Sequence, residues 1–349
     1  MILLKKEKIG SRRIITLLGI KIKYKKIKLK EILKNNPHNT FLNDVQKVGF
    51  EFNRKKTLCT IAKFENHLQE INDFLYKNLN DDDKKTFVLF CLKRHGSIDV
   101  VSKSEKAYLD SLFKKAYEIY KSRSSVDEPM DVEFKDKKLK YLSNSSTKIK
   151  TINDRNLLFC CYEMVHAFFI NEYYKEGFSP QDGQTVFDCG SCSGDTALAF
   201  SAQYQNSKIY TFECDNNLFE LVKKNIQINE LQNVYPQKCF LSRETGEMEI
   251  GGKIEKTLSI DDFVKENNLT DIGLIKFDIE GAELEALKGS INTIKEQKPI
   301  LMVPIYHRDS DIYEIPQFLH ALNIPAIFSL KWTEKRVLGV DCVLFVKFI

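Results

Sequence analysis

The sequence predicts an α/β fold in which a mostly parallel sheet, closed by an antiparallel hairpin, is preceded by an α-helical N-terminal domain. From Thr185 onward, short apolar runs alternate with helical segments, as in a parallel sheet covered on both faces. Between residues 40 and 130 apolar side chains instead recur every three or four residues, which is the helical period. The last two apolar runs are joined by one short loop, which favours an antiparallel pair.

The N-terminal half contains segments of different character. Residues 1–36 alternate apolar and basic residues, most clearly over 20–30. This period of two fits an edge strand or a segment lying on an anionic surface, and a solvated arm explains it equally well. Residues 37–150 form the predicted helical domain and its connector. The connector, over 121–150, is rich in Ser, Lys and Asp, with few large apolar residues.

Several helices are expected in the N-terminal half. Apolar residues recur at helical steps between residues 64 and 75. In residues 79–95 acidic residues precede an apolar run and basic residues follow it, the order that the helix macrodipole favours. Further helices are predicted at 104–121 and, just before the α/β pattern begins, at 157–174.

Residues 151–349 form the predicted α/β domain. Five strands are expected, at 185–189, 208–214, 233–240, 274–278 and 299–306. Helices are expected at 196–205, 216–229, 281–290 and 312–322. The closing hairpin is predicted from two more strands, at 325–332 and 341–348.

The composition indicates a soluble globular protein. Hydrophobic residues make up 43% and charged residues 29% of the 349 residues, which excludes wholesale disorder. No apolar run approaches the roughly 20 residues that a membrane-spanning helix needs. Nine cysteines are too few for a disulfide scaffold and favour a reducing cytoplasm. The Arg12–Arg13 pair resembles a twin-arginine export signal, but the apolar segment after it is short and no cleavage site follows.

The formal charge of +5 is unevenly distributed. Residues 1–36 contain twelve Lys or Arg and two acidic residues, a net charge of +10, so the remainder carries −5. The acidic remainder has no long basic stripe, and nucleic-acid binding is therefore not expected. The basic arm, with its interspersed Ile and Leu, fits peripheral contact with an anionic inner membrane surface.

The loop after the first predicted strand has the strongest functional pattern. DCGSCSGDT, residues 188–196, runs through Gly190 and Gly194 into the start of a helix. Glycines let the backbone turn tightly and approach a ligand, and the helix N-terminus adds unpaired N–H groups. The glycine spacing differs from the G-x-G-x-x-G of dinucleotide-binding dehydrogenases. The loop therefore predicts a nucleotide-like cofactor and disfavours NAD.

Charged residues follow three of the other predicted strands. Glu213 ends the second strand, where doubly wound folds place a carboxylate that binds ribose hydroxyls. Four charged residues cluster at the end of the fourth strand: Lys276, Asp278, Glu280 and Glu283. His307 follows the fifth strand, and histidine is the side chain best matched to accept a proton near neutral pH. Because ligands bind at this edge of open sheets, these residues predict a site of proton transfer.

Cys189 and Cys192 form a C-x-x-C pair inside the glycine loop. A zinc site would need a second well-spaced pair, but Cys214 and Cys239 stand apart in the sequence. A redox pair is not expected inside a cofactor loop. We therefore expect neither a bound metal nor redox chemistry here.

Three segments together resemble the FkbM-type family of S-adenosylmethionine-dependent methyltransferases. They are VFDCGSCSGDTALAF (186–200), YTFECDNN (210–217) and IKFDIEGAELEALKGS (275–290), similar to the first motif, the acidic second motif and the most specific signature of the family. MVPIYHRDSDIYEIPQFL (302–319) is similar to a segment of some members. The resemblance covers residues 183–322. It departs from the family pattern at Ser191–Cys192 and near Cys239–Ser242.

The resemblance implies a Rossmann-like methyltransferase fold, S-adenosyl-L-methionine as the methyl donor and a hydroxyl oxygen as the acceptor. Members often modify sugars of bacterial surface glycans. The implied acceptor is therefore a sugar hydroxyl of such a glycan, or of its nucleotide-sugar or lipid-linked precursor, in polysaccharide biosynthesis.

The resemblance and the motifs assign the site residues. Eight are expected to contact the cofactor: Asp188, Gly190, Cys192, Gly194, Asp195, Thr196, Glu213 and Asp215. The expected catalytic residues are Asp278, Glu280 and His307. Either His307 or Glu280 accepts the hydroxyl proton, while Asp278 orients the acceptor or the positive end of the donor.

Two other functions fit the same residues. A non-catalytic Rossmann-fold binding protein would use the helical half as an interaction module. An NAD-dependent oxidoreductase is disfavoured by the glycine spacing. Calorimetry that compares the binding of S-adenosylmethionine with that of NAD would distinguish these functions from a methyltransferase.

Overall fold

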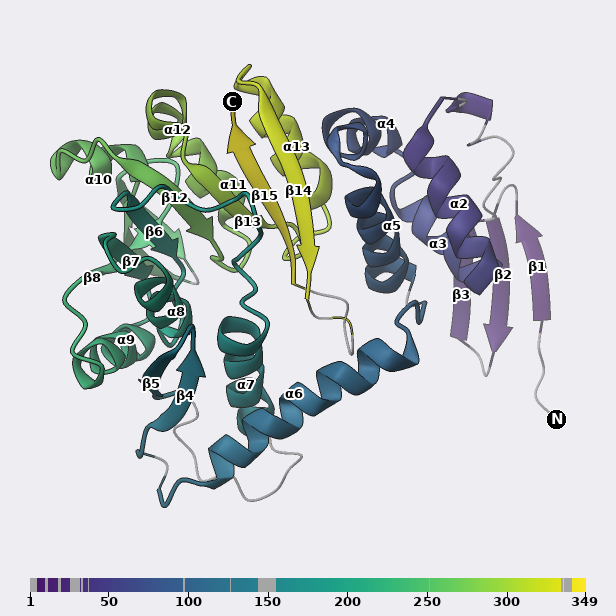
Figure 1. Cartoon of the computed structure of the whole chain (residues 1–349). Helices are drawn as coiled ribbons and strands as arrows, with labels where there is room; N and C mark the ends of the chain where they lie inside the picture. Colours follow the sequence, from purple (N-terminus) through teal and green to yellow (C-terminus); the bar gives the residue numbers. More distant parts are fainter. Residues whose placement is uncertain are drawn as a thin grey trace.

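The computed structural model describes residues 5–9, 12–17, 20–25, 32, 34–36, 38–96, 98–125, 127–143, 155–250, 252–333, 335 and 341–349. Figure 1 shows a central sheet with helices on both sides. The N-terminal helices pack beside its β14 end, and the long helix α6 (Lys103–Lys121) leads away from them to the opposite side of the molecule.

The central sheet has seven strands in the order β14-β15-β13-β12-β6-β7-β8. Their bounds are β6 Thr185–Cys189, β7 Ile209–Glu213, β8 Val234–Lys238, β12 Ile272–Phe277, β13 Ile300–Pro304, β14 Ala326–Trp332 and β15 Cys342–Phe348. Among these seven, β15 alone is antiparallel to its neighbours, β13 and β14. The predicted parallel sheet with one antiparallel strand from a closing hairpin is therefore confirmed.

The inner strands are apolar along their whole length because both faces of the sheet are covered. Every residue of β6, β12 and β13 is buried. Neighbouring residues of β6 point to opposite faces: Val186 packs in a core with Ala197 and Phe200, and Phe187 packs with Phe263 at a ring-centroid distance of 5.7 Å. These runs of buried residues are the reason that the sequence predicted the strands correctly.

Helices of the α/β half follow the strands as predicted, with two additions, at 260–266 and 291–297. Their bounds are α8 Asp195–Gln203, α9 Asn216–Ile228, α10 Ile260–Glu266, α11 Glu283–Lys288, α12 Ile291–Gln297 and α13 Asp311–Ala321. Helix α10 was not predicted. It follows a hairpin of β10 (Gly246–Ile250) and β11 (Lys253–Leu258), which pairs with the short β9 (Phe240–Leu241). The hairpin was missed because its sequence is rich in Gly, Glu and Lys.

The N-terminal helices share one core with the sheet. They are α2 Thr40–Phe52, α3 Arg54–Lys63, α4 Leu68–Glu70, a π turn η1 (Ile71–Leu75), a 3₁₀ turn η2 (Tyr76–Asn78) and α5 Asp81–Gly96. This core includes Phe41 of α2, Phe87 of α5 and Phe348 at the end of β15. Helix α5 lies against β14, and Ser329 of β14 donates a hydrogen bond to Asp83 at the start of α5.

The predicted connector at 121–150 is wrong in its middle, which forms a β-hairpin. Strands β4 (Met130–Phe134) and β5 (Lys137–Tyr141) pair around the positive-φ residues Lys135 and Asp136. Buried and exposed residues alternate along β4, the period of a half-covered strand. Polar residues between the apolar ones concealed this short alternation.

The predicted helix at 157–174 is too long at its C-terminal end. Helix α7 covers Arg155–Met164 and continues as a π turn, η3 (Val165–Phe169). The chain then leaves the helix through Asn171, which has a φ of 50°. This early end frees Glu172 and Tyr173 to line a cavity.

The basic arm contains an antiparallel three-stranded sheet. Its strands are β1 Lys5–Ile9, β2 Arg12–Leu17 and β3 Ile20–Lys25. The side chains of these strands lie outside the described part of the structure, so their predicted contact with a membrane stays a prediction. No helix in the described part of the chain is long and apolar enough to cross a membrane.

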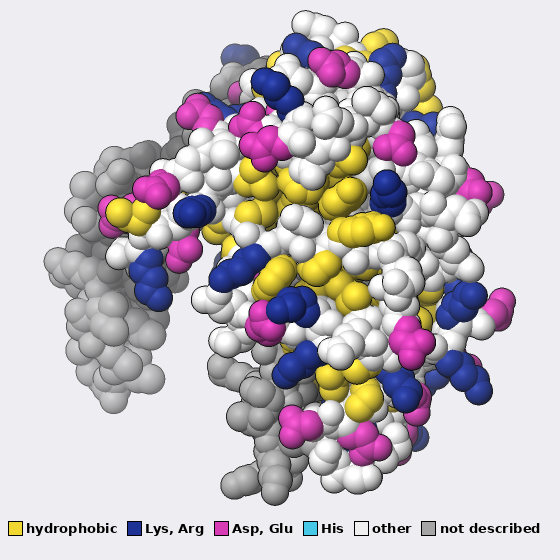
Figure 2. All heavy atoms as spheres, turned by 90° about the vertical axis from the view of Figure 1, so that its left-hand side faces the viewer, with side chains coloured by type: hydrophobic (Ala, Val, Ile, Leu, Met, Phe, Trp, Pro, Cys, Tyr) yellow, Lys and Arg dark blue, Asp and Glu magenta, His cyan; other side chains and the backbone are white. Residues whose placement is uncertain are grey.

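Figure 2 shows the face of the molecule that forms the left-hand side of Figure 1, where β8 is the edge strand. Hydrophobic side chains gather in its middle, and basic and acidic side chains are mixed around them. Tyr235 of β8 and Met248 of β10 are exposed hydrophobic residues of this part of the chain.

Candidate functional site

Two adjoining cavities lie at the carboxyl edge of the parallel strands. The first, of about 470 Å³, reaches from the glycine loop to α7 and the start of β15; the second, of about 440 Å³, lies toward β7 and β9. They share four lining residues: Gly190, Cys192, Asp278 and Glu280. A further cavity, of about 460 Å³, is lined by β5 and α9 and contains no predicted site residue.

The glycine loop forms the floor between the two cavities. Gly190 has a φ of 85°, and a Cβ on it would lie 1.8 Å from the carbonyl oxygen of Asp278. The loop therefore passes directly against the end of β12, which only glycine permits. Gly194, with a φ of 86°, is the N-cap of α8. The helix thus begins immediately after the loop, with its N-terminus beside the first cavity.

An internal ion pair beneath the loop fixes its position. Lys276 Nζ lies 3.0 Å from Asp188 Oδ1 and donates to the carbonyl oxygen of Gly190 at 2.7 Å. Thr196 Oγ1 donates to Asp188 Oδ2 at 2.8 Å. Burial would lower the pKa of Lys276, but the charges of Asp188 and Asp278 outweigh it and hold the pKa above its usual value. Asp188 lines neither cavity, so the structure gives it a role in positioning the loop.

Glu213 ties the end of β7 to the glycine loop. Its Oε2 accepts from the backbone N–H of Cys192, and its Oε1 from that of Asp215, both at 2.9 Å. Burial raises the pKa of Glu213, while these N–H groups act in the opposite direction. Asp215 caps α9 through Asn217 N at 2.8 Å. Both acidic residues line the second cavity, beside the apolar side chain of Leu218.

The predicted catalytic residues meet at the boundary of the cavities. His307 Nε2 lies 3.4 Å from Asp278 Oδ1 and 3.8 Å from Glu280 Oε2, and its Nδ1 lies 2.8 Å from Glu283 Oε1. Tyr173, which sequence reasoning missed, donates a hydrogen bond to Asp278 Oδ2 at 2.9 Å. The segments that follow β12 and β13 therefore converge as predicted, and the segment of Tyr173 joins them, although the assignment of catalytic roles stays a prediction.

Burial and charge change the protonation of this group. Burial alone would lower the pKa of His307, but Glu283, Asp278 and Glu280 outweigh it and raise the pKa to about 9. Burial raises the pKa of Asp278 to about 6 against the opposing charge of Lys276. At neutral pH the imidazole is therefore a cation that faces carboxylates. A protonated imidazole has no free nitrogen for a metal, although Asp278, Glu283 and His307 offer ligand atoms within 4.8 Å of one another.

Two more carboxyl groups face the first cavity near the start of α8. Glu163 of α7 accepts from Ser193 Oγ at 2.6 Å and from Ser143 Oγ at 2.7 Å. Burial, with the neighbouring Glu163, raises the pKa of Asp195 well above its usual range. Asp195 was predicted, whereas Glu163 was missed because it lies within an apolar helical segment.

Comparison with known proteins reveals structural relatives of low sequence identity. The methyltransferase FkbM from Methylobacillus flagellatus KT matches with a TM-score of 0.54 at 15% identity, over 83% of this chain and 61% of that chain. The present chain thus spans less than two thirds of that protein, and at 15% identity the likeness shows a shared fold alone.

Other matches are more distant. Precorrin-6y C5,15-methyltransferase from Geobacter metallireducens GS-15 gives a TM-score of 0.36 at 11% identity, over 60% of this chain and 96% of that one. A SAM-dependent methyltransferase from Aquifex aeolicus gives a TM-score of 0.35 at 17% identity, over 54% of this chain and 93% of that chain. Comparison with curated proteins gave no match. Residues 188–324 match the family model described as the methyltransferase FkbM domain.

Proposed function

We propose that the protein is an S-adenosyl-L-methionine-dependent O-methyltransferase that modifies a sugar hydroxyl. The observation that carries this proposal is the position of Asp278 and His307 at the boundary of two adjoining cavities. One cavity suits a nucleoside and the other an acceptor. A methyl group to be transferred would then lie between them, beside groups that can accept a proton.

The second cavity has the groups that a nucleoside needs. Glu213 is fixed by two backbone N–H groups, and its carboxylate oxygens keep further lone pairs for ribose hydroxyls. Leu218, Phe240 and Leu241 supply an apolar wall suited to a base. Gly190 lines both cavities, and the absence of a side chain there lets the loop lie against Asp278.

The first cavity would hold the amino-acid end of the donor and the acceptor. Asp195 and Thr196, at the start of α8, line it; the Asp195 carboxyl group suits an ammonium group, and the backbone N–H groups at the helix start suit a carboxylate. When bound, the donor supplies a methyl group activated by its positively charged sulfur. Asp278 and Tyr173 then orient the groups around it, and His307 or Glu280 accepts the proton of the acceptor hydroxyl.

The lining of the first cavity favours a sugar as the acceptor. Aromatic rings of Phe159, Tyr162 and Tyr306 line it together with the carboxylates of Glu172 and Asp278. Carboxylates accept hydrogen bonds from sugar hydroxyls, and aromatic rings pack against the apolar face of a sugar ring. A glycan or its nucleotide-sugar or lipid-linked precursor, as in polysaccharide biosynthesis, fits this chemistry.

Binding and transfer experiments test the proposal directly. Calorimetry should show binding of S-adenosylhomocysteine, and incubation with a labelled methyl donor should label a nucleotide sugar or an extracted surface glycan. The variants Asp278→Asn and His307→Ala should retain cofactor affinity but lose roughly 10²–10⁴-fold in rate. Binding of NAD in place of the methyl donor would contradict the proposal, and binding without transfer to any acceptor would favour a non-catalytic protein.

We further infer a cytoplasmic location with peripheral contact at the inner membrane surface. The nine cysteines form no disulfide, which fits a reducing compartment. The charge of +10 in residues 1–36 would attract anionic lipid headgroups. Such contact would bring the active site close to a lipid-linked acceptor.

A further inference from the structure

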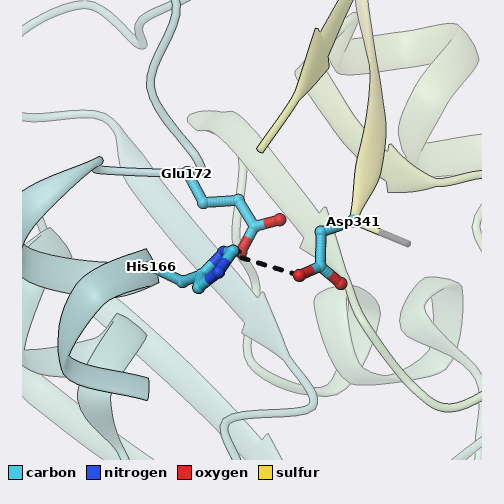
Figure 3. A group of neighbouring side chains, drawn as sticks. All are labelled: His166, Glu172 and Asp341. Atoms are coloured by element: carbon cyan, nitrogen blue, oxygen red, sulfur yellow. Dashed lines mark ion pairs between the residues drawn. The ribbon is translucent and has the colours of Figure 1, made fainter. Parts of the chain in front are cut away.

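A second group of ligating side chains lines the first cavity. His166 comes from η3, Glu172 from the segment after it, and Asp341 from the start of β15 (Figure 3). Their exposed fractions are 3%, 7% and 1%. In Figure 3 both carboxylates lie on one side of the imidazole, and a dashed line marks its ion pair with Asp341. Parts of the chain more than 160 positions apart thus bring one nitrogen and two acidic groups together.

The distances within this group are those of metal ligands. His166 Nδ1 lies 3.5 Å from Glu172 Oε2 and 3.5 Å from Asp341 Oδ2. An N–H···O hydrogen bond is normally about 2.7–3.2 Å long, so neither contact is an ordinary hydrogen bond. An ion with bonds of about 2.1 Å would hold neighbouring ligand atoms roughly 3.0 Å apart in octahedral and 3.4 Å apart in tetrahedral geometry. The ligand atoms of all three residues lie within 4.8 Å of one another.

The surrounding contacts support the same interpretation. Thr333 Oγ1 donates to Glu172 Oε1 at 3.0 Å, as outer-sphere partners of metal ligands commonly do. Tyr162 donates to Asp341 Oδ2, which leaves Oδ1 of the same carboxylate for a cation. Asp341 Oδ1 is buried and has no hydrogen-bond partner among the residues that the structure describes. A buried carboxylate oxygen left without a partner is costly, and a bound cation would satisfy it.

We propose that His166, Glu172 and Asp341 bind a divalent transition-metal cation of the Mn²⁺ type in the wall of the first cavity. One imidazole and two carboxylates combine the donors preferred by Zn²⁺ and Fe²⁺ with those preferred by Mn²⁺. Three protein ligands leave coordination positions open toward the cavity.

The open positions face the space in which the acceptor would lie. Tyr173 follows Glu172 directly and donates to Asp278, so the metal group and the predicted catalytic group share one wall. This part of the inference rests on the proposed function: the cation would bind acceptor hydroxyl oxygens and orient one of them toward the methyl group. Binding of the cation itself does not depend on that function.

Titration of the full-length protein with Mn²⁺, followed by electron paramagnetic resonance and calorimetry, tests the site. We expect saturation at one ion per chain and coupling of its signal to an imidazole nitrogen. Asp341→Asn and Glu172→Gln should each raise the dissociation constant at least about tenfold. Asp131→Asn, an exposed change of the same charge on β4, should leave it unchanged.

Two outcomes would overturn the metal site. One is the absence of saturable binding or of nitrogen coupling in the wild-type protein, which requires no variant to fold. The other is loss of binding in Glu283→Gln but not in Asp341→Asn, which would place the ion at His307 instead. Methyl transfer after chelation is measured separately: metal binding without transfer would reject the acceptor role alone, and transfer without metal binding would reject the metal site alone.

Discussion

Gly190 is the residue whose identity the structure constrains most directly. We expect Gly190→Ala to cost more than about 3 kcal/mol in the free energy of unfolding, because its Cβ would overlap the backbone of Asp278 in addition to the positive-φ strain. Gly177 is a matched control: its φ is 82°, but nothing lies within 4 Å of an added Cβ. Gly177→Ala should therefore cost only about 1–2 kcal/mol. Urea unfolding measures both, and equal losses would contradict the packing argument.

Glu213 provides a second test at the residue scale. Glu213→Ala should weaken binding of S-adenosylhomocysteine by about 1–3 kcal/mol, because a charge-assisted contact to the ribose and the anchor of Cys192 N are lost together. Calorimetry on a folded variant measures this loss, with the exposed Glu220→Gln change as the control. Unchanged affinity would remove Glu213 from the cofactor site.

The protonation of His307 makes the rate depend on pH. Because the folded protein holds the pKa of His307 at about 9, a His307 that acts as the base must first lose its proton. The methyl-transfer rate should therefore rise with pH until about 9. Glu283→Gln removes the carboxylate beside Nδ1, lowers the pKa of His307 and should move this limb of the profile to lower pH.

Rate measurements between pH 6 and 10 on wild type and Glu283→Gln check this expectation. The affinity for the methyl donor, measured at each pH, controls for changes in binding. A rate that stays constant from pH 7 to 9.5 would exclude His307 as the base and leave Glu280, whose side chain is 91% exposed.

At the scale of elements, the unpredicted hairpin β4–β5 supports the glycine loop. The buried Asn225 of α9 accepts from Leu142 N and donates to Leu142 O and Ser193 O, at 2.7–2.8 Å. The hydroxyl groups of Tyr141, at the end of β5, and Ser193, in the loop, are also hydrogen-bonded to each other. The hairpin, α9 and the loop are thus joined by one polar side chain.

Replacement of this side chain should loosen the loop. We expect Asn225→Ala to cost about 2–3 kcal/mol in unfolding free energy and to weaken donor binding, since three backbone groups lose their partner. Asn229, one turn later, bonds to Lys140 N and O near solvent, and Asn229→Ala should cost less than about 1 kcal/mol because water can replace it. Equal effects of the two changes on donor binding would show that the hairpin does not support the loop.

For the whole molecule, the charge distribution leads to a prediction about location. Replacement of Lys21, Lys23, Lys25, Lys26, Lys28 and Lys30 by Gln removes six of the ten net positive charges of residues 1–36. The wild-type chain should float with vesicles that contain anionic lipid. The variant should remain unbound, because each Lys near an anionic surface contributes about 1 kcal/mol of attraction. Neutral vesicles and high salt serve as controls. Equal flotation of the two chains would reject membrane contact through the arm.

The sequence alone determined the parallel sheet, its closing hairpin and the meeting of Asp278, Glu280 and His307. Buried strands such as 272–277 are continuous apolar runs, and their carboxyl ends share one edge for geometric reasons. Short elements with mixed polar composition, such as the hairpin over 130–141, left no comparable signal.

Only the tertiary structure decided which other side chains enter the cavities. Tyr173 and His166 lie in an apolar segment that resembles a simple core helix, and the early end of that helix turns the chain toward Asp278. Asp341 reaches His166 from the far end of the sequence through the order of the strands. Contacts of this kind depend on the packing of distant segments, for which local periodicity contains no information. The protonation of His307 likewise follows from burial and from three carboxylates that the fold brings around it.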